Sequence, residues 1–172
     1  MRHKDQRIGI FIDVQNLYHS AKNIHGKVNY QELIKSLTAG RHLIRALGYV
    51  VKSEEVIGEV SGEASFFEAL EKAGIDLRVK DLQIFHGGMK KADWDVGMAV
   101  DAIRMSDALD VVVIVTGDGD FIPLVEYLKW GKGRVVEVAA FARNASGKLK
   151  EVADLFVDLE KTPKIVMRGR SR

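Results

Sequence analysis

The sequence predicts an α/β fold in which helices cover both faces of a parallel sheet. Short runs rich in β-branched residues alternate with longer segments that have helical periodicity. The segment DVVVIVTG at residues 110–117 is an apolar run ending in turn residues, as expected of a central parallel strand that is buried on both faces. The chain of 172 residues has only two prolines and no repeat or low-complexity tract, which fits one continuous domain.

The predicted elements follow one another in a regular order. Each strand is a short apolar run bounded by polar or turn residues, and strands are expected over residues 8–14, 49–51, 75–81, 110–117, 134–141 and 155–159. Helices are expected over residues 16–21, 30–37, 61–72, 94–106, 121–130 and 146–153. A glycine-containing loop, HGGMKK, precedes the fourth helix. Ligands of parallel sheets bind beyond the carboxyl ends of the strands, so a site is expected at that edge.

The composition excludes several classes of site. The chain has no cysteine, which excludes disulfides, thiolate zinc sites, iron–sulfur clusters and cysteine nucleophiles. The sequence contains neither a GxxxxGK[ST] phosphate loop nor a GxSxG nucleophile elbow. The longest strongly apolar run, residues 111–115, is too short to cross a bilayer, and the N-terminal segment lacks a signal-peptide cleavage site, so the cytoplasm is the expected location. The histidines have no metal-ligand spacing and are expected at the surface: His3, His19, His25, His42 and His86.

Charge is distributed unequally along the chain. The whole chain carries a net charge of +2, but residues 161–172 contain five basic residues and no acidic one, so residues 1–160 carry −3. We therefore expect a domain at residues 1–160 and a basic, flexible C-terminal tail at residues 161–172 that contacts nucleic acid. A frayed and solvated terminus is the alternative interpretation of this tail.

Two predicted strands end in carboxylates. Asp13 closes the first strand in IFIDVQN, with Asn16 three residues later. Asp118 and Asp120 follow the central strand in VTGDGDF, with Thr116 just before them. Because the carboxyl ends of parallel strands meet at one edge of the sheet, these acids are expected to converge, and the flanking glycines would let the chain turn sharply around Asp118. The alternatives are a helix N-cap for Asp13 and an ordinary turn for GDGD.

A further acid is expected from the helix that begins in WDVGMAVDAI. Asp95 shares a helix face with small and apolar residues at i+3, i+4 and i+7, where an unpaired acid is costly to bury. Asp93 is interpreted as the N-cap of this helix, and Asp101 is expected to pair with Arg104 at the surface.

Several carboxylates at one place repel one another unless a cation neutralises them. Oxygen ligands without cysteine or clustered histidine favour Mg²⁺ or Mn²⁺ over zinc or copper. Such a cation suits phosphodiester chemistry, because it generates hydroxide at modest pH and stabilises the leaving oxygen. The residues therefore predict a divalent-metal site for phosphodiester chemistry.

The set IFIDVQN, DVGMAVD and VTGDGDF, in this order and at these distances, resembles the NYN domain of the PIN-like nuclease superfamily, in particular its bacterial LabA-like branch. The resemblance spans about residues 7–159. It implies a three-layer α/β/α sandwich with a mostly parallel five- or six-stranded sheet, and a metal-dependent ribonuclease whose expected partner is single-stranded RNA. The acidic site of the family corresponds here to Asp13, Asp95, Asp118 and Asp120, with Asn16 and Thr116 beside them.

Two positions depart from the family pattern. Thr116 stands where many relatives have Ser, which keeps the hydroxyl group. The segment KKADWDV differs in spacing from the more usual Lys-Gly-x-Asp, so Asp93 stays open as the helix acid beside Asp95. Lys90 and Lys91, in the loop before this helix, are expected to meet substrate phosphates, and two solvated loop lysines are the alternative.

The leading hypothesis is a ribonuclease that depends on Mg²⁺ or Mn²⁺. Asp13, Asp118 and Asp120 would hold the cation, and Asp95 would complete its ligand set or orient the attacking water. Asn16 and Thr116 would orient these carboxylates or contact a substrate phosphate.

Two rival functions belong to other classes. One is a non-catalytic RNA-binding or regulatory module that keeps the acidic pocket for a structural cation. The other is a phosphohydrolase of small phosphate esters, which the first strand disfavours because it carries Asp13-Val14-Gln15 instead of the DxD pattern of haloacid dehalogenases. A homodimer is a further possibility, although the sequence does not identify an interface for it.

Overall fold

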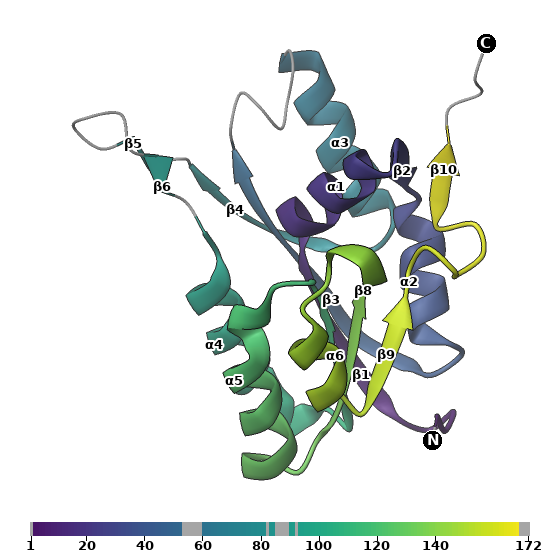
Figure 1. Ribbon diagram of the computed structural model, residues 1–172, viewed down its shortest axis with the longest axis vertical. Coiled ribbons are helices and arrows are strands. Elements are labelled where there is room, and N and C mark those ends of the chain that lie inside the picture. The colour runs from purple at the N-terminus through teal and green to yellow at the C-terminus, as the bar shows by residue number, and fades with distance from the viewer. Residues whose placement is uncertain (1, 53–59, 82, 85–89, 92, 169–172) are drawn as a thin grey trace.

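The computed structural model describes residues 2–52, 60–81, 83–84, 90–91 and 93–168. Its centre is a six-stranded sheet in the order β4-β3-β1-β7-β8-β9, with every neighbouring pair parallel (Figure 1). The strands are β1 (Arg7–Asp13), β3 (His42–Lys52), β4 (Asp76–Asp81), β7 (Val111–Val115), β8 (Val135–Ala140) and β9 (Leu155–Asp158). The chain builds outward from β1 to β4 and then from β7 to β9, so its two halves diverge at the β1/β7 boundary.

Helices cover both faces of this sheet (Figure 1). On one face pack α1 (Val14–Asn23), α2 (Tyr30–Thr38) and α3 (Val60–Lys72), and on the other α4 (Asp95–Met105), α5 (Ile122–Glu126) and α6 (Gly147–Val152). Strand residues alternate between two cores, so that Ile10 and Val113 face the first layer of helices while Phe11 and Val112 face the second. The predicted three-layer α/β/α fold is confirmed, and the central sheet has six strands.

Two small antiparallel ribbons accompany the main sheet. β2 (Gly26–Val28) pairs with β10 (Val166–Arg168), and β5 (Gln83–Ile84) pairs with β6 (Lys90–Lys91). Figure 1 shows the β5–β6 ribbon beyond the end of β4, away from the body of the molecule.

The strand expected over residues 49–51 is longer than predicted, because β3 pairs with β1 from His42 onward.

The predicted flexible tail is wrong for residues 161–168. The side chain of Ile165 is fully buried, and its carbonyl oxygen accepts the backbone N–H of Asn29 at 2.8 Å. β10 then hydrogen-bonds to β2. An apolar side chain inside the basic segment therefore fastens it to the body.

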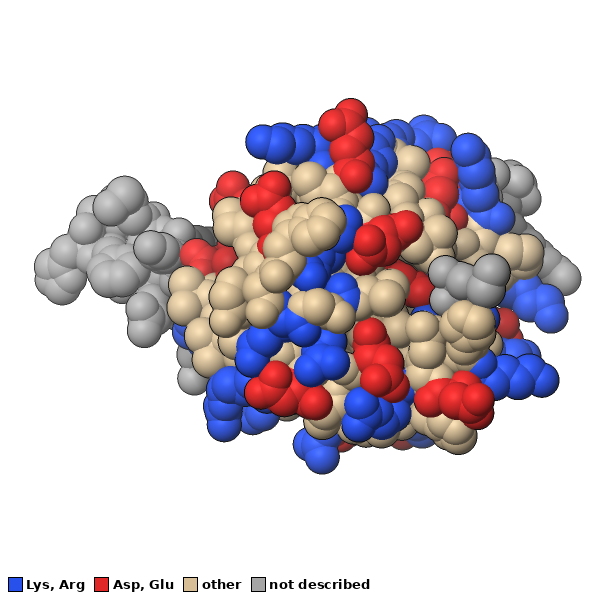
Figure 2. Space-filling model, turned by 90° about the horizontal axis from the view of Figure 1, so that it is seen from below, with Lys and Arg blue, Asp and Glu red and all other residues tan. Residues whose placement is uncertain are grey.

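The opposite end of the sheet, where the strands begin, is held by charge pairs. Arg41 and Glu137 are buried and make two hydrogen bonds, at 2.8 and 3.1 Å, and Arg2 adds two more to the same carboxylate. Figure 2 looks onto this end and shows basic and acidic residues interspersed over it.

No helix in the described ranges is long and apolar enough to cross a membrane.

Candidate active site

The predicted strand-end residues lie side by side at the carboxyl edge of the sheet. Register pairs Ile12 of β1 with Val115 of β7, so the next residues along, Asp13 and Thr116, emerge next to each other. This is the boundary at which the two halves of the sheet diverge, and parallel sheets place their ligands in the crevice at such a point.

Three carboxylates converge at this edge. Asp95, Asp118 and Asp120 each offer one oxygen atom, and these three oxygens lie within 4.8 Å of one another. Asp95 comes from the first turn of α4, whereas Asp118 and Asp120 belong to the turn after β7, where the 3₁₀ segment η2 (Gly119–Phe121) begins. Asp95 and Asp118 are half-buried and Asp120 is exposed. Residues about 25 positions apart in the sequence thus form one acidic cluster, called here the Asp95 cluster.

Asp13 lies beside this cluster and has partners of its own. Its Oδ1 accepts the backbone N–H of Asn16 at 3.1 Å, which makes it the N-cap of α1, and its Oδ2 accepts the hydroxyl of Thr116 at 3.1 Å. Burial raises the pKa of Asp13, while these hydrogen bonds act to lower it. Asp13 therefore serves as a helix cap and also adds negative charge next to the cluster.

Asn16 and Thr116 bind the two strand ends together. The side-chain oxygen of Asn16 accepts the backbone N–H of Gly117 at 3.0 Å, and the Thr116 hydroxyl oxygen accepts that of Asp118 at 3.2 Å. Asp118 in turn accepts the backbone N–H of Asp120 at 2.9 Å. These contacts hold the Asp118 turn against α1. Contact of Asn16 or Thr116 with a substrate stays a prediction.

Gly117 serves close packing. Its φ angle is not positive, so the sharp turn expected at the GDGD glycines does not need a left-handed backbone here. A Cβ at Gly117 would lie 3.1 Å from both Ala145 Cα and the Asn144 carbonyl oxygen. The backbone N–H of Ser146 also donates to the Gly117 carbonyl at 2.9 Å. Glycine lets the segment at residues 144–146 support the acidic turn from behind.

Trp94 sets the position of Asp95. Its indole N–H donates to the Val50 carbonyl of β3 at 2.9 Å, and its ring packs edge-to-face on Tyr49 with centroids 5.5 Å apart. A Cβ at Gly97 would lie only 2.6 Å from the Trp94 ring, so the absence of a side chain there makes room for it. The sequence analysis did not assign a role to Trp94 or Gly97. The available signal was a Trp three positions before a helical glycine.

The prediction that Asp93 caps α4 is wrong. Trp94 occupies the N-cap position, no side chain caps this helix end, and the carbonyl of the exposed Asp93 accepts Lys80 Nζ at 3.1 Å. The indole anchor on β3 starts the helix one residue later than a cap at position 93 would. Asp93 is not part of the Asp95 cluster, and so the structure places Asp95 at the site.

Asp101 has a stronger partner than the one expected from the sequence. The hydroxyl of the buried Tyr49 donates to Asp101 Oδ2 at 2.9 Å, whereas the predicted pair with Arg104 is present at 3.9 Å. This hydrogen bond ties the middle of α4 to β3 and supports the helix that carries Asp95.

The Asp95 cluster has uncompensated negative charge. The pKa of Asp95 is raised to about 6, first by burial and then by repulsion from Asp13, Asp93, Asp118 and Asp120. Within the described part of the chain, no Lys, Arg or His forms an ion pair with a cluster carboxylate. One octahedral Mg²⁺ places opposite ligands about 4.2 Å apart, so small side-chain rotations would close the cluster around it. The oxygen-only donors therefore fit a hard divalent cation.

Several other predicted residues lie away from this cluster. The backbone of Lys90 and Lys91 forms β6, and their side chains, like the whole of His86, fall outside the described residues. Their contact with phosphate stays a prediction. The histidines at 3, 19, 25 and 42 are exposed, as predicted. His19 nonetheless lies close enough to Asp13 for its charge to lower the pKa of that acid slightly.

Comparisons with known proteins cover nearly the whole chain. The model of the NYN domain family matches residues 7–160. The low amplitude and bright protein LabA of Synechococcus elongatus is 25% identical in an alignment of 168 residues, which covers 92% of this chain and 87% of LabA. The crystal structure of a protein of unknown function from Vibrio parahaemolyticus is similar with a TM-score of 0.85 and 27% identity, covering 97% of this chain and 99% of that one.

Proposed function

The chain belongs to the NYN domain family, as its motifs predicted, and on that premise we propose that it is a divalent-metal-dependent ribonuclease acting on single-stranded RNA. NYN domains are generally nucleases, which supports phosphodiester hydrolysis as the reaction class. The observation that carries the proposal is the Asp95 cluster, in which three carboxylates from two separate elements converge at the sheet edge.

In this proposal Asp95, Asp118 and Asp120 hold Mg²⁺ or Mn²⁺, and Asp13 contributes a fourth negative charge beside them. A bound divalent cation lowers the pKa of a water ligand and neutralises charge on the leaving oxygen of a phosphodiester. The protein's part is to keep the carboxylates in place before substrate arrives. Thr116 and Asn16 do this for the Asp118 turn, and Trp94 does it for Asp95.

The test is cleavage of end-labelled single-stranded RNA with Mn²⁺, with Mg²⁺, and with excess chelator. We expect metal-dependent cleavage by the wild-type protein and a loss of at least about 100-fold in Asp118→Asn, since the variant removes one negative charge from the proposed metal ligands while its amide oxygen can still accept the Asp120 N–H. Asp93→Asn is the matched control, because it removes a nearby exposed carboxylate that lies outside the cluster, and it should cleave like the wild type.

Two outcomes would decide against this proposal. Cleavage that survives both chelation and Asp118→Asn would come from a contaminant or from a different site. RNA binding without cleavage under any metal condition would favour the non-catalytic RNA-binding module. The cytoplasmic location and a homodimer stay predictions.

A further inference from the structure

A second candidate site lies outside the Asp95 cluster. A cavity of about 580 Å³ opens between α1, β2, α3 and β10, with Tyr30 of α2 in its wall. Figure 1 shows α1, β2, α3 and β10 together at the end of the molecule toward which the strands point. The cavity walls include the rings of Tyr18, Tyr30 and Phe66 and the side chains of Lys22 and Lys27. This volume is typical of small-ligand sites, and the lining combines apolar surface with a few charges, as such sites do.

The aromatic walls form a rigid platform. The Phe66 ring meets Tyr18 edge-to-face with centroids 6.1 Å apart, and it meets Tyr30 in the same way at 5.9 Å. Tyr30 is buried and supports the Phe66 ring from the interior, whereas Tyr18 and Phe66 are only half-buried. An edge-to-face contact covers a face of only one of the two rings, and the half-buried Tyr18 and Phe66 keep part of their surface accessible. A planar base stacks on an accessible ring face whatever its identity.

The two lysines bring positive charge to the same cavity. Lys22 and Lys27 are exposed, and no acidic side chain in the described ranges forms an ion pair with either. The lysines of α2 and α3 differ, since Lys35 pairs with Glu32 at 4.0 Å and Lys72 with Glu68 at 2.6 Å. Lysines without an ion-pair partner beside half-buried rings match a ligand that is aromatic at one end and anionic at the other, which is the chemistry of a nucleotide.

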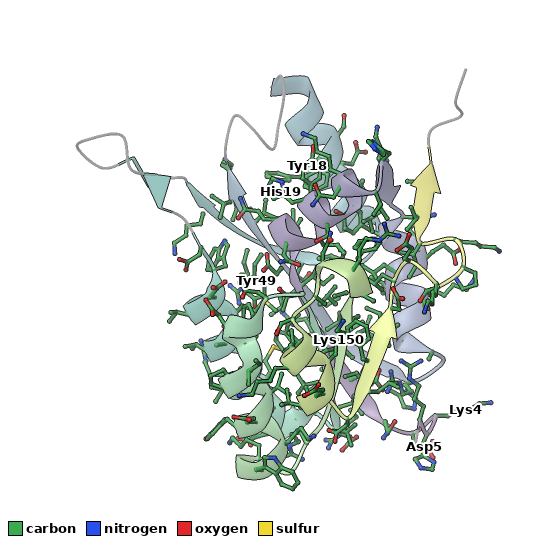
Figure 3. The ribbon with its side chains drawn as sticks, in the orientation of Figure 1. Lys4, Asp5, Tyr18, His19, Tyr49 and Lys150 are labelled. Carbon is green, nitrogen blue, oxygen red and sulfur yellow. The ribbon has the colours of Figure 1, made fainter. Side chains whose placement is uncertain are left out.

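Helix α1 connects this cavity with the Asp95 cluster. Asp13 caps the helix beside the cluster, while Tyr18 and Lys22 lie one turn apart on the same side of it. At 1.5 Å per residue, Tyr18 lies about 7.5 Å and Lys22 about 13.5 Å along the axis from Asp13. Figure 3 shows Tyr18 and His19 on α1 near α3, at the end where the strands finish. A nucleic-acid strand that passes the cluster therefore has only a short way to reach the cavity.

We infer that this cavity binds one nucleotide of single-stranded RNA close to the bond that is cleaved. Its base stacks against Tyr18 and Phe66, and its phosphate lies against Lys22 and Lys27. This inference rests on the proposed function. Holding the strand at a second point fixes the phosphate that lies at the carboxylates, which lowers the entropy cost of the reaction.

The experiment measures the affinity of the full chain for labelled single-stranded RNA in Ca²⁺, which suppresses turnover. Tyr18→Ala should weaken binding by about tenfold, because it removes one of the two rings on which the base stacks. Tyr18→Phe should bind like the wild type, since it keeps the ring. Tyr127→Ala is the matched control, as it removes an exposed tyrosine near the opposite face of the sheet and should leave affinity unchanged.

A second measurement does not depend on the aromatic packing. Lys22→Ala combined with Lys27→Ala should flatten the salt dependence of RNA affinity by about 1.4 in the log–log slope, at about 0.7 per phosphate contact. Lys35→Ala combined with Lys72→Ala is the matched pair on α2 and α3, and it should leave the slope unchanged. Equal slopes for the two double variants, or equal affinities of Tyr18→Ala and Tyr127→Ala, would overturn the inference.

The outcomes separate this inference from the proposed nuclease activity. Metal-dependent cleavage with no effect of the cavity variants on binding leaves the nuclease in place and removes the cavity site. RNA binding that depends on Tyr18 but is followed by no cleavage would support the cavity site and rule out the nuclease. A free mononucleotide that displaces RNA at a concentration near the RNA's own Kd would assign the cavity to a free nucleotide and overturn the RNA assignment. Failure of the wild-type protein to bind RNA would overturn it as well.

Discussion

Thr116 donates its hydroxyl hydrogen to Asp13 across the boundary between β1 and β7, with 3.1 Å between Oγ1 and Oδ2. The same hydroxyl oxygen accepts the backbone N–H of Asp118 at 3.2 Å. Thr116 is 1% exposed, so this hydroxyl connects two of the predicted site acids without being directly accessible to solvent. Because a buried polar group without a partner is costly, the contact also makes Thr116 a probe of how rigidly the acidic edge is held.

Thr116→Val keeps the shape of the side chain but removes both hydrogen bonds. We expect a loss of about 1–3 kcal/mol in the free energy of unfolding, since the Asp13 carboxylate and the Asp118 N–H both lose a buried partner. Thermal denaturation in chelator measures this loss, and Mn²⁺ titration should show weaker binding. Thr116→Ser is the control and should stay close to the wild type. Equal behaviour of the Val and Ser variants would mean that the hydroxyl contributes little.

The raised pKa of Asp95 predicts a pH-dependent stability of the metal-free protein. An unfolded Asp has a pKa of about 3.9, whereas Asp95 titrates at about 6 in the folded chain. A carboxyl group with a raised folded pKa stabilises the fold fully below the unfolded pKa, and this contribution is lost as pH rises through the folded pKa. Ionised Asp95 therefore opposes folding at neutral pH unless a cation is bound.

Asp95→Asn isolates this contribution. In chelator at pH 7.5 we expect the variant to be more stable than the wild type by on the order of 1 kcal/mol, a value kept small because Asp95 is only half-buried. This advantage should shrink toward pH 5, where wild-type Asp95 is itself protonated. Melting curves of both proteins at the two pH values measure the difference, and Mn²⁺ should stabilise only the wild type strongly. A constant difference at both pH values would contradict the assignment of the pKa.

The strand-end acids could be found from the sequence because their placement follows from the sheet. An apolar run such as residues 111–115 predicts a buried parallel strand, and parallel strands bring their carboxyl ends to one edge. Asp13 and Asp118 follow from that rule alone. Asp95 needed the helix pattern as well, and the sequence left it open beside Asp93. The grouping of Asp95 with Asp118 and Asp120 favours Asp95, and it depends on how the Trp94 ring packs on β3.

Other features had no local signal. β2 and β10 have three residues each, too few to show a periodicity, and Val28 lies 138 positions before its partner Val166 in the sequence. The cavity is likewise formed by residues from three separate parts of the chain, 18–30, 62–69 and 167. Charge composition made residues 161–172 look like a solvated tail, because five basic residues hid the apolar contacts of Ile165, which is fully buried, and Val166, which packs against the same core.

Gly97→Ala should disturb the site from within α4. The new methyl group would lie 2.6 Å from the Trp94 ring, which must then move and lose its hydrogen bond to the Val50 carbonyl. Although Ala favours a helix by about 1 kcal/mol over Gly, we expect a net loss of stability and weaker Mn²⁺ binding, because the first turn that carries Asp95 shifts with Trp94. Indole fluorescence, melting temperature and Mn²⁺ titration measure these effects.

Val100→Ala serves as the control for this helix. It changes an exposed position of α4 that is 45% accessible, so it should leave all three measurements near their wild-type values. A Gly97→Ala protein with unchanged fluorescence and Mn²⁺ affinity would show that the helix absorbs the methyl group without moving Asp95.

Ile165→Ala tests whether the C-terminal segment is part of the fold. The side chain is fully buried in the core shared with α1 and α2, so its truncation should cost about 2–5 kcal/mol and lower the melting temperature by several degrees. Truncation after Glu160 should cost at least as much, since it removes Ile165 and β10 together. Truncation after Arg168 keeps both and should leave the melting temperature unchanged.

This truncation after Arg168 removes two charged side chains, Arg170 and Arg172. Any effect on RNA affinity must then come from these two charges, and the salt slope should flatten by at most about 1.4. Equal melting temperatures of the wild type and the Ile165→Ala variant would restore the interpretation of residues 161–172 as a frayed terminus.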